Sequence, residues 1–211
     1  MLRPDPMTPM PDPDLPAMFE RMYDAAAAGD GALPWHRGEA HPLLAAWTEG
    51  LRGAGRRALV VGSGTGDDAE FVAGLGFDVV AFDVSPSAVA MARRRFPGST
   101  VDYGVADLLA LPAAWSRAFD LVVEVLTVQS TPIAVHEAAI AAIAGTVAPG
   151  GTLIVVATAR VDDAQIPDGP PWPLARAEID AFGTAGLAAE QVDVVGSPGA
   201  PPRYRAVFRR T

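Results

Sequence analysis

The chain has 211 residues, half of them hydrophobic, a formal net charge of −9, three histidines and no cysteine. The length allows one sizeable core, and the absence of cysteine excludes disulfides, thiolate metal sites and a cysteine nucleophile. The histidines are widely spaced, which does not suggest a zinc site, so no metal is expected. The negative charge disfavours nucleic acid and anionic membranes, and no apolar run approaches the ~20 residues of a membrane span. A small molecule is therefore the expected partner.

The N-terminal part is predicted to be a tail followed by a helical lid. Prolines recur through residues 1–16, so we expect a disordered or polyproline tail there. The tail lacks an apolar signal core, which favours a cytoplasmic location. Helices are predicted over 17–28 and 41–51, joined by a loop that contains Trp35 and His36. Residues 17–211 then form a single domain, with the lid over 17–53 and a core over 57–211.

Residues 57–83 read RALVVGSGTGDDAEFVAGLGFDVVAFD and organise the core. The pattern predicts a buried strand over 58–61, a glycine turn over 62–66, and a helix capped by Asp67 or Asp68 and ended by Gly76. A second strand over 77–82 is closed by Asp83. Such a strand, glycine turn, helix and strand make a nucleoside-binding unit, whose closing acid can accept both ribose hydroxyls.

The residues after the glycine turn bear on which nucleoside binds. A dinucleotide motif, G-x-G-x-x-G, would place glycine at position 67, where this chain has Asp67 followed by Asp68. Two carboxylates at a helix N-terminus repel a pyrophosphate. S-adenosylmethionine has no phosphate and carries a cationic sulfonium and an ammonium, so it suits the turn better.

The remaining pattern alternates strands with helices and ends in a hairpin. Helices are predicted over 85–96, 132–147 and 174–185, and strands over 100–106, 119–126 and 152–158. Residues 187–195 and 203–209 form the hairpin, whose last strand alternates Tyr204, Ala206 and Phe208 with Arg203, Arg205 and Arg209. The expected fold is α/β, a Rossmann-like doubly wound sheet of seven strands. Five strands are parallel, the C-terminal hairpin is antiparallel, and helices cover both faces.

Five motifs, VVGSGTG, VVAFDVSP, VADLLALP, FDLVVEVLT and VAPGGTLIVVA, resemble those of class I S-adenosylmethionine-dependent methyltransferases. The resemblance covers roughly residues 17–210 and implies methyl transfer (EC 2.1.1.-) with S-adenosyl-L-methionine as cofactor. It implies that the backbone of Gly62, Gly64 and Gly66 contacts the methionine part and that Asp83 contacts the ribose. It also implies that Val84 lies beside the adenine, and that the adenine edge is lined by Ala106, Asp107 and Leu108.

A narrower resemblance is to the thiopurine and thiol methyltransferase branch. LPWHRGEAHPLL is similar to the segment that closes over cofactor and acceptor in that branch, and Asp68 and the Glu124 of FDLVVE also fit it. The chain departs from the pattern at Val125, where the branch often has an arginine, and at Val60, where many class I enzymes carry an acid. The resemblance implies a small-molecule acceptor, with a thiol or another chalcogen as its expected class.

Individual site residues remain candidates. Glu124 lies in an apolar strand and needs a partner, which is the cofactor, the acceptor or a structural group. Glu124 and His36 are the candidate catalytic residues. In-line displacement, however, requires alignment of acceptor, methyl carbon and sulfur more than it requires an acid or base. Segments 33–41 and 168–172 are expected to shield the reaction. The expected acceptor-site residues are Trp35, His36, Gln129 and Trp172, whereas His136 is expected to be structural or exposed.

Two other functions stay open. The chain could be a non-catalytic module that binds S-adenosylmethionine, because catalysis by alignment leaves no signature in a sequence. The chain could also be an NAD(P)-dependent oxidoreductase, although Asp67 and the terminal hairpin argue against this function. A monomer or a homodimer is expected.

Overall fold

The computed structural model describes residues 15–160, 166–184, 186–197 and 199–211. The predicted N-terminal tail therefore lies outside the described residues, apart from its last two positions. Those two, Leu15 and Pro16, already belong to helix α1 (Leu15–Ala28), so the tail was predicted two residues too long. Proline is tolerated in the first turn of a helix because its missing N–H would have no partner there.

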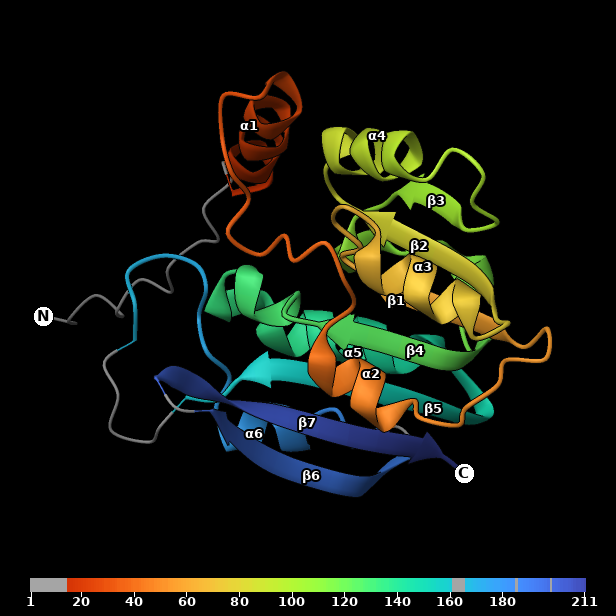
Figure 1. Ribbon diagram of the computed structural model, residues 1–211. Helices are drawn as coiled ribbons and strands as arrows, with labels where there is room; N and C mark the ends of the chain where they lie inside the picture. The colour runs from red at the N-terminus through yellow and green to blue at the C-terminus, as the bar shows by residue number, and fades with distance from the viewer. Residues whose placement is uncertain (1–14, 161–165, 185, 198) are drawn as a thin grey trace, which may run out of the picture.

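Seven strands form one mixed sheet in the order β3-β2-β1-β4-β5-β7-β6, as Figure 1 shows. Strands β1 to β5 pair in parallel, and β7 is antiparallel to both of its neighbours, β5 and β6. Because β6 returns to the direction of the first five strands, only β7 is reversed. The predicted sheet is confirmed. The strands are β1 (Arg57–Val61), β2 (Asp78–Asp83), β3 (Asp102–Val105), β4 (Phe119–Val125), β5 (Val147–Thr158), β6 (Leu187–Ser197) and β7 (Ala200–Arg210).

Helices cover both faces of the sheet, as predicted. Along β1, Ala58 and Val60 pack in the cluster with α2 (Pro42–Trp47), α3 (Asp67–Gly74) and α4 (Pro86–Arg95). The alternate residues Leu59 and Val61 pack in the cluster with α5 (His136–Thr146) and α6 (Arg176–Asp180). This alternation is the period of two expected of a strand buried on both faces. Within the described ranges no helix is both long and apolar enough to cross a membrane.

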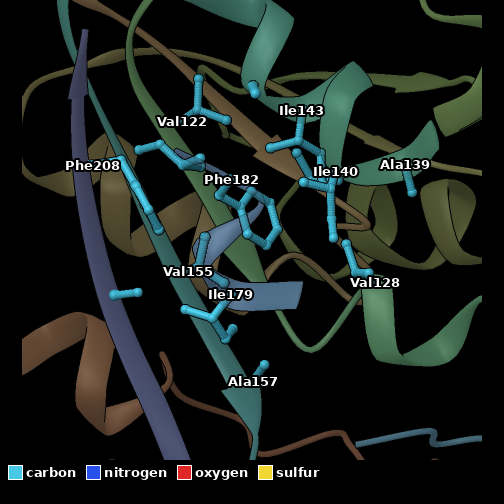
Figure 2. Packing of buried hydrophobic residues seen from close by; sticks show 14 of the residues in the cluster. Val122, Val128, Ala139, Ile140, Ile143, Val155, Ala157, Ile179, Phe182 and Phe208 are labelled. Atoms are coloured by element: carbon cyan, nitrogen blue, oxygen red, sulfur yellow. The ribbon is translucent and has the colours of Figure 1, made fainter. Parts of the chain in front are cut away.

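The larger core lies between the sheet and α5 and α6, where Phe182 and Phe208 pack with Val122, Val155 and Ile143 (Figure 2). All five side chains have no more than a trace of exposed surface. The last strand alternates as predicted, because Tyr204, Ala206 and Phe208 are buried while Arg203, Arg205 and Arg209 keep solvent contact. Arg210 breaks the pattern, since it is 3% exposed and donates to the carbonyls of Val147 and Ala144 at 2.8 and 2.7 Å.

Several helices are shorter than their sequence pattern predicts. The helix predicted over 41–51 ends at Trp47, because the Thr48 hydroxyl donates to the carbonyls of Leu44 and Ala45 and Gly50 turns to positive φ. The helix predicted over 174–185 is confined to α6. Short 3-10 turns occupy Leu108–Ala110, Ala113–Trp115, Val128–Ser130 and Ile133–Val135.

Two glycines offer a matched test of packing around β1. A Cβ at Gly53 would lie 2.3 Å from the backbone of Gly76 and Phe77, whereas a Cβ at Gly74, at the end of α3, would meet nothing within 4 Å. We expect Gly53→Ala to lower the free energy of unfolding by about 1–3 kcal/mol through overpacking. Gly74→Ala should raise it by about 0.5–1 kcal/mol, because a helical glycine costs backbone entropy. Urea unfolding measures both, and equal effects would contradict the packing described here.

Candidate functional site

The glycine turn between β1 and α3 is held in a conformation that favours glycine. Gly62, Gly64 and Gly66 have φ of 59, 52 and 93°. A Cβ at Gly62 would lie 2.4 Å from the Thr127 hydroxyl, and one at Gly66 would lie 2.5 Å from the Tyr103 hydroxyl. The turn is therefore a backbone cradle that side chains would fill.

The cap of α3 differs from the prediction. Gly66 occupies the N-cap, and Asp67 and Asp68 are the first two residues of the helix. The expectation that one of these acids caps the helix was wrong, because the chain enters α3 through a left-handed residue and glycine adopts that conformation without strain. Both acids therefore remain available for contacts with other segments.

Asp83 joins the glycine turn to the end of β2. Its Oδ2 accepts the N–H of Gly64 at 2.9 Å, and its Oδ1 accepts the N–H of Ser85 at 3.0 Å. Burial raises the pKa of Asp83, and these backbone donors oppose that shift. Each carboxylate oxygen has a second lone pair, so the group can still accept two hydroxyl donors. Val84 follows it with 39% of its surface exposed.

The residues expected at the adenine edge have mixed orientations. Ala106 donates its N–H to the carbonyl of Asp83 at 3.1 Å, so it adjoins the same strand end. Asp107 caps a 3-10 turn by accepting the N–H of Leu109 at 2.8 Å. The side chain of Leu108 is buried in the core, so it cannot offer apolar surface to a ligand. The exposed apolar side chains of this region are instead those of Val105 and Leu109, which are 55% and 48% exposed and which the sequence analysis missed.

The acids of the first turn of α3 hold the 33–41 segment. Asp67 pairs with Arg95 at 2.7 Å and contacts His36 Nδ1 at 3.2 Å. His36 also lies 3.0 Å from the Thr65 hydroxyl. Asp68 accepts the N–H of His41 at 2.7 Å, and burial raises the pKa of Asp68 to about 6. Asp68 was predicted as a cofactor residue, and the structure gives it a partner in the 33–41 segment.

Helix α1 supplies two residues that sequence analysis did not single out. Tyr23 is 4% exposed, accepts the indole N–H of Trp35 at 2.9 Å, and has its hydroxyl 2.9 Å from the ideal Cβ position of Gly64. Burial, and then the charge of Asp83, raise the pKa of Tyr23, so its phenol stays protonated. Glu20 accepts the hydroxyls of Ser85 and Ser87 at 2.5 and 2.7 Å. These contacts fasten α1 above the glycine turn.

Glu124 lies at the end of β4 and is completely buried. Its Oε1 accepts the N–H groups of Thr127 and Val128 at 2.7 and 3.0 Å, while its Oε2 has no hydrogen-bond partner among the described residues. Burial raises the pKa of Glu124 to about 7, against these two donors. One carboxylate oxygen thus has a structural partner.

The acceptor-site candidates fall into two groups. The side-chain Oε1 of Gln129 accepts the N–H of Thr158 at 2.6 Å, and the backbone carbonyl of Gln129 accepts the N–H of Trp172 at 2.7 Å. These residues meet where β4 and β5 end. Trp35 and His36 instead contact α1 and the glycine turn. His136 has the expected structural role, because it is 3% exposed and its ring nitrogens lie 2.5 Å from Glu178 Oε1 and 2.9 Å from the Thr131 carbonyl.

The raised pKa of Glu124 predicts a pH-dependent stability. Between pH 4.5, the ordinary value, and about 7, the folded chain keeps a proton that the unfolded chain loses, so stability falls as pH rises. A shift of about 2.5 at ~1.4 kcal/mol per pH unit gives on the order of 3 kcal/mol. We expect Glu124→Gln to recover much of this lost free energy of unfolding at pH 8 and little of it at pH 5.

Denaturant unfolding of Glu124→Gln at both pH values measures the effect. Glu137→Gln, on the exposed side of α5, is the control and should show no comparable dependence on pH. A Glu124→Gln variant less stable than wild type at pH 8 would show that the ionised carboxylate has a stabilising partner.

Comparison with known proteins shows what the chain is similar to. Residues 58–151 match a family model described as a methyltransferase domain. This segment includes the glycine turn, Asp83 and Glu124. The search of curated proteins returned no match.

Solved structures share the fold over most of both chains. A protein of echinomycin biosynthesis, studied for the conversion of a disulfide bond into a thioacetal group, is 23% identical, with a TM-score of 0.71 and coverage of 91% of this chain and 93% of that one. The [4+2]-cyclase SpnF is 20% identical, with a TM-score of 0.72 and coverage of 91% and 94%. The 1,6-didemethyltoxoflavin-N1-methyltransferase of Burkholderia thailandensis is 18% identical, with a TM-score of 0.69 and coverage of 93% and 87%.

The toxoflavin methyltransferase was crystallised with its acceptor and S-adenosylhomocysteine, which is consistent with the cofactor expected here. At these identities the structures show the fold alone. Residues 58–151 thus match a methyltransferase domain model, and the chain has the seven-stranded methyltransferase fold.

Proposed function

We propose that this protein transfers the methyl group of S-adenosylmethionine to a small-molecule acceptor. The observation that carries the proposal is the junction of the glycine turn with Asp83. A buried carboxylate that holds the N–H of Gly64 is fixed beside a backbone cradle, at the strand ends where ligands bind in such sheets. The exposed Val84, Val105 and Leu109 give this region an apolar side suited to an adenine.

The acids that follow the turn favour this cofactor over a dinucleotide. Asp67, Asp68 and Glu70 all lie in the first turn of α3. They would repel a pyrophosphate, whereas a sulfonium and an ammonium are cations. The NAD(P) alternative is therefore disfavoured by charge, and comparative titration with both cofactors tests it.

The chain's own contribution is alignment and shielding. S-adenosylmethionine supplies an activated methyl group, so the residues around it need only hold the reactants in line and exclude water. Segment 33–41 is tied to the first turn of α3 by Asp67 and Asp68, and the loop that contains Trp172 is tied to Gln129. Figure 1 shows both segments along the edge where the parallel strands end.

A thiol or another soft chalcogen is the proposed acceptor. An alcohol would need a positioned base, and two of the three candidates, Glu124 and His41, are poorly placed for that role. Glu124 is completely buried with one oxygen already engaged. His41 uses Nδ1 to accept the N–H of Leu43, and burial with the charges of Arg203 and Arg37 lowers the pKa of His41 to about 4. A thiol near pKa ~8.5 supplies its own thiolate.

A non-catalytic module is the second candidate. The fold leaves it open, because the architecture also occurs in SpnF, a [4+2]-cyclase, and so does not by itself imply methyl transfer. Detection of S-adenosylhomocysteine across thiols, selenols, phenols, amines and carboxylates distinguishes the two. Turnover of any acceptor excludes the non-catalytic module.

The cofactor site is tested through Asp83. We expect Asp83→Ala to weaken S-adenosylmethionine and S-adenosylhomocysteine together by about 1.5–3 kcal/mol, because a charge-assisted pair of hydrogen bonds is lost. Isothermal titration measures this, with thermal melts to confirm folding. Asp120→Ala removes the same charge at the other end of the strands, where Asp120 accepts the N–H of Arg57, and should leave binding intact. Equal binding by all three proteins would refute the site.

The acceptor is tested by pH dependence. We expect kcat/KM to rise with pH along the titration of the acceptor thiol and to shift when a more acidic thiol is used. His36→Ala should cause only a modest loss, because the thiolate needs no base. A profile fixed at one pKa for every acceptor, and abolished in His36→Ala, would indicate general-base methylation of oxygen or nitrogen instead.

A further inference from the structure

His136 joins three segments of the chain on one side of the sheet. It is the first residue of α5 and is 3% exposed. Its Nδ1 lies 2.5 Å from Glu178 Oε1 of α6, and its Nε2 lies 2.9 Å from the carbonyl of Thr131, in the turns before α5. The other oxygen of Glu178 accepts the N–H of Ala175 at 2.7 Å and pairs with Arg160, just after β5, at 3.3 Å. One carboxylate thus connects α5, α6 and the end of β5.

These contacts require a proton on both ring nitrogens of His136. A backbone carbonyl only accepts hydrogen bonds, so Nε2 must donate to Thr131. A neutral imidazole has a single N–H and would then turn a lone pair toward Glu178. Glu178 does not supply the missing proton, because burial alone would raise the pKa of Glu178, yet the hydrogen bonds from His136 and Ala175 lower it overall. The contacts therefore make His136 a buried imidazolium.

This cation occupies a place that is unfavourable without its partner. His136 begins α5, where the helix dipole disfavours a positive charge. Glu178 meets it from α6, and Arg160 shares that carboxylate from beyond β5. On β4, Glu124 feels the charge of His136, which opposes the larger effect of burial on the pKa of Glu124. Glu137, the next residue of α5, is exposed. The position of the ring thus depends on its proton and on Glu178.

The carbonyl of Thr131 connects the imidazolium to the loop that contains Trp172. Thr131 closes the 3-10 turn Val128–Ser130, because its N–H and its hydroxyl both donate to the carbonyl of Val128. The same turn carries Gln129, whose backbone carbonyl accepts the N–H of Trp172 at 2.7 Å. A shift of Thr131 therefore moves the group that holds Trp172.

We propose that His136 is a proton switch for the loop that contains Trp172. At neutral pH the imidazolium holds both Glu178 and Thr131. At alkaline pH it loses one proton, and the remaining N–H stays with Glu178, because a bond to a carboxylate is the stronger of the two. The lone pair left on Nε2 repels the carbonyl of Thr131, so the turn releases Trp172. That this opens the acceptor side rests on the proposed function.

Nuclear magnetic resonance of the full chain tests the switch without turnover. With ¹⁵N-labelled histidine, we expect both ring nitrogens of His136 to carry protons at pH 7. As the pH rises, the protection of the Trp172 N–H from hydrogen exchange, corrected for the intrinsic effect of pH, should fall about tenfold or more along the His136 titration. The N–H of Ser63, which donates to the carbonyl of Phe82 at 2.8 Å, is the internal control and should keep its protection.

Two substitutions of His136 form a matched pair. The amide nitrogen of glutamine lies near the place of Nε2, and that of asparagine lies near the place of Nδ1. His136→Gln therefore keeps the bond to Thr131 at every pH, whereas His136→Asn keeps only the bond to Glu178. We expect the Trp172 N–H to stay protected in His136→Gln and to lose protection in His136→Asn even at pH 7. Glu137→Gln changes the exposed neighbour and should keep the wild-type titration.

Thermal melts check that the variants fold. Ile140 of α5 and Ile179 of α6 both lie in the larger core (Figure 2), so the two helices keep their apolar packing without the ring of His136. S-adenosylhomocysteine should bind equally well to wild type and His136→Asn, because the glycine turn and Asp83 make no contact with His136.

The outcomes separate the switch from the function. A neutral His136 at pH 7, or protection of Trp172 that does not follow the His136 titration, would overturn the switch. Equal loss of protection at Ser63 would indicate global unfolding and overturn it as well, as would wild-type protection in His136→Asn. If wild type fails to bind S-adenosylhomocysteine, the proposed function is wrong, and the resonance measurements still decide the switch.

Discussion

The site depends on one buried carboxylate. Asp83 accepts the N–H of Gly64 across the two strand ends and the N–H of Ser85 along the chain, and it is 7% exposed. Burying a charge is costly unless donors compensate it, so the glycine turn and the start of α4 must keep their places for the acid to stay ionised. The same bonds that stabilise this region also orient the carboxylate that we propose binds the ribose.

A second set of acids fastens the N-terminal segment to this centre. Asp67 and Asp68 do not cap α3, and so they are available to His36 and to the backbone of His41. The loop that contains Trp172 has its own anchor at Gln129. The edge where the parallel strands end is thus flanked from two sides by segments held by hydrogen bonds, and Leu33 and Trp35 of one of them also pack on α1.

The sequence predicted the sheet well because strand and helix periods are local properties. Alternation along residues 203–209 predicted the buried face of β7, and the glycine turn with Asp83 predicted the nucleoside unit. What failed depended on tertiary contacts. Asp67 and Asp68 are of a residue type that often caps helices, yet the N-cap of α3 is Gly66, whose backbone is left-handed. Leu108 and Leu109 are adjacent in a 3-10 turn with opposite exposure, which depends on what the fold places over each of them.

Ser85 participates in three contacts at once. Its N–H bonds Asp83, its hydroxyl caps α4 by accepting the N–H of Ala88 at 3.0 Å, and the same hydroxyl donates to Glu20 of α1. Lifting α1 away would therefore disturb the residue that steadies the carboxylate of Asp83. If the proposed lid opens by lifting α1, the same movement would also loosen the grip on a bound nucleoside, and uncovering a spent cofactor would release it.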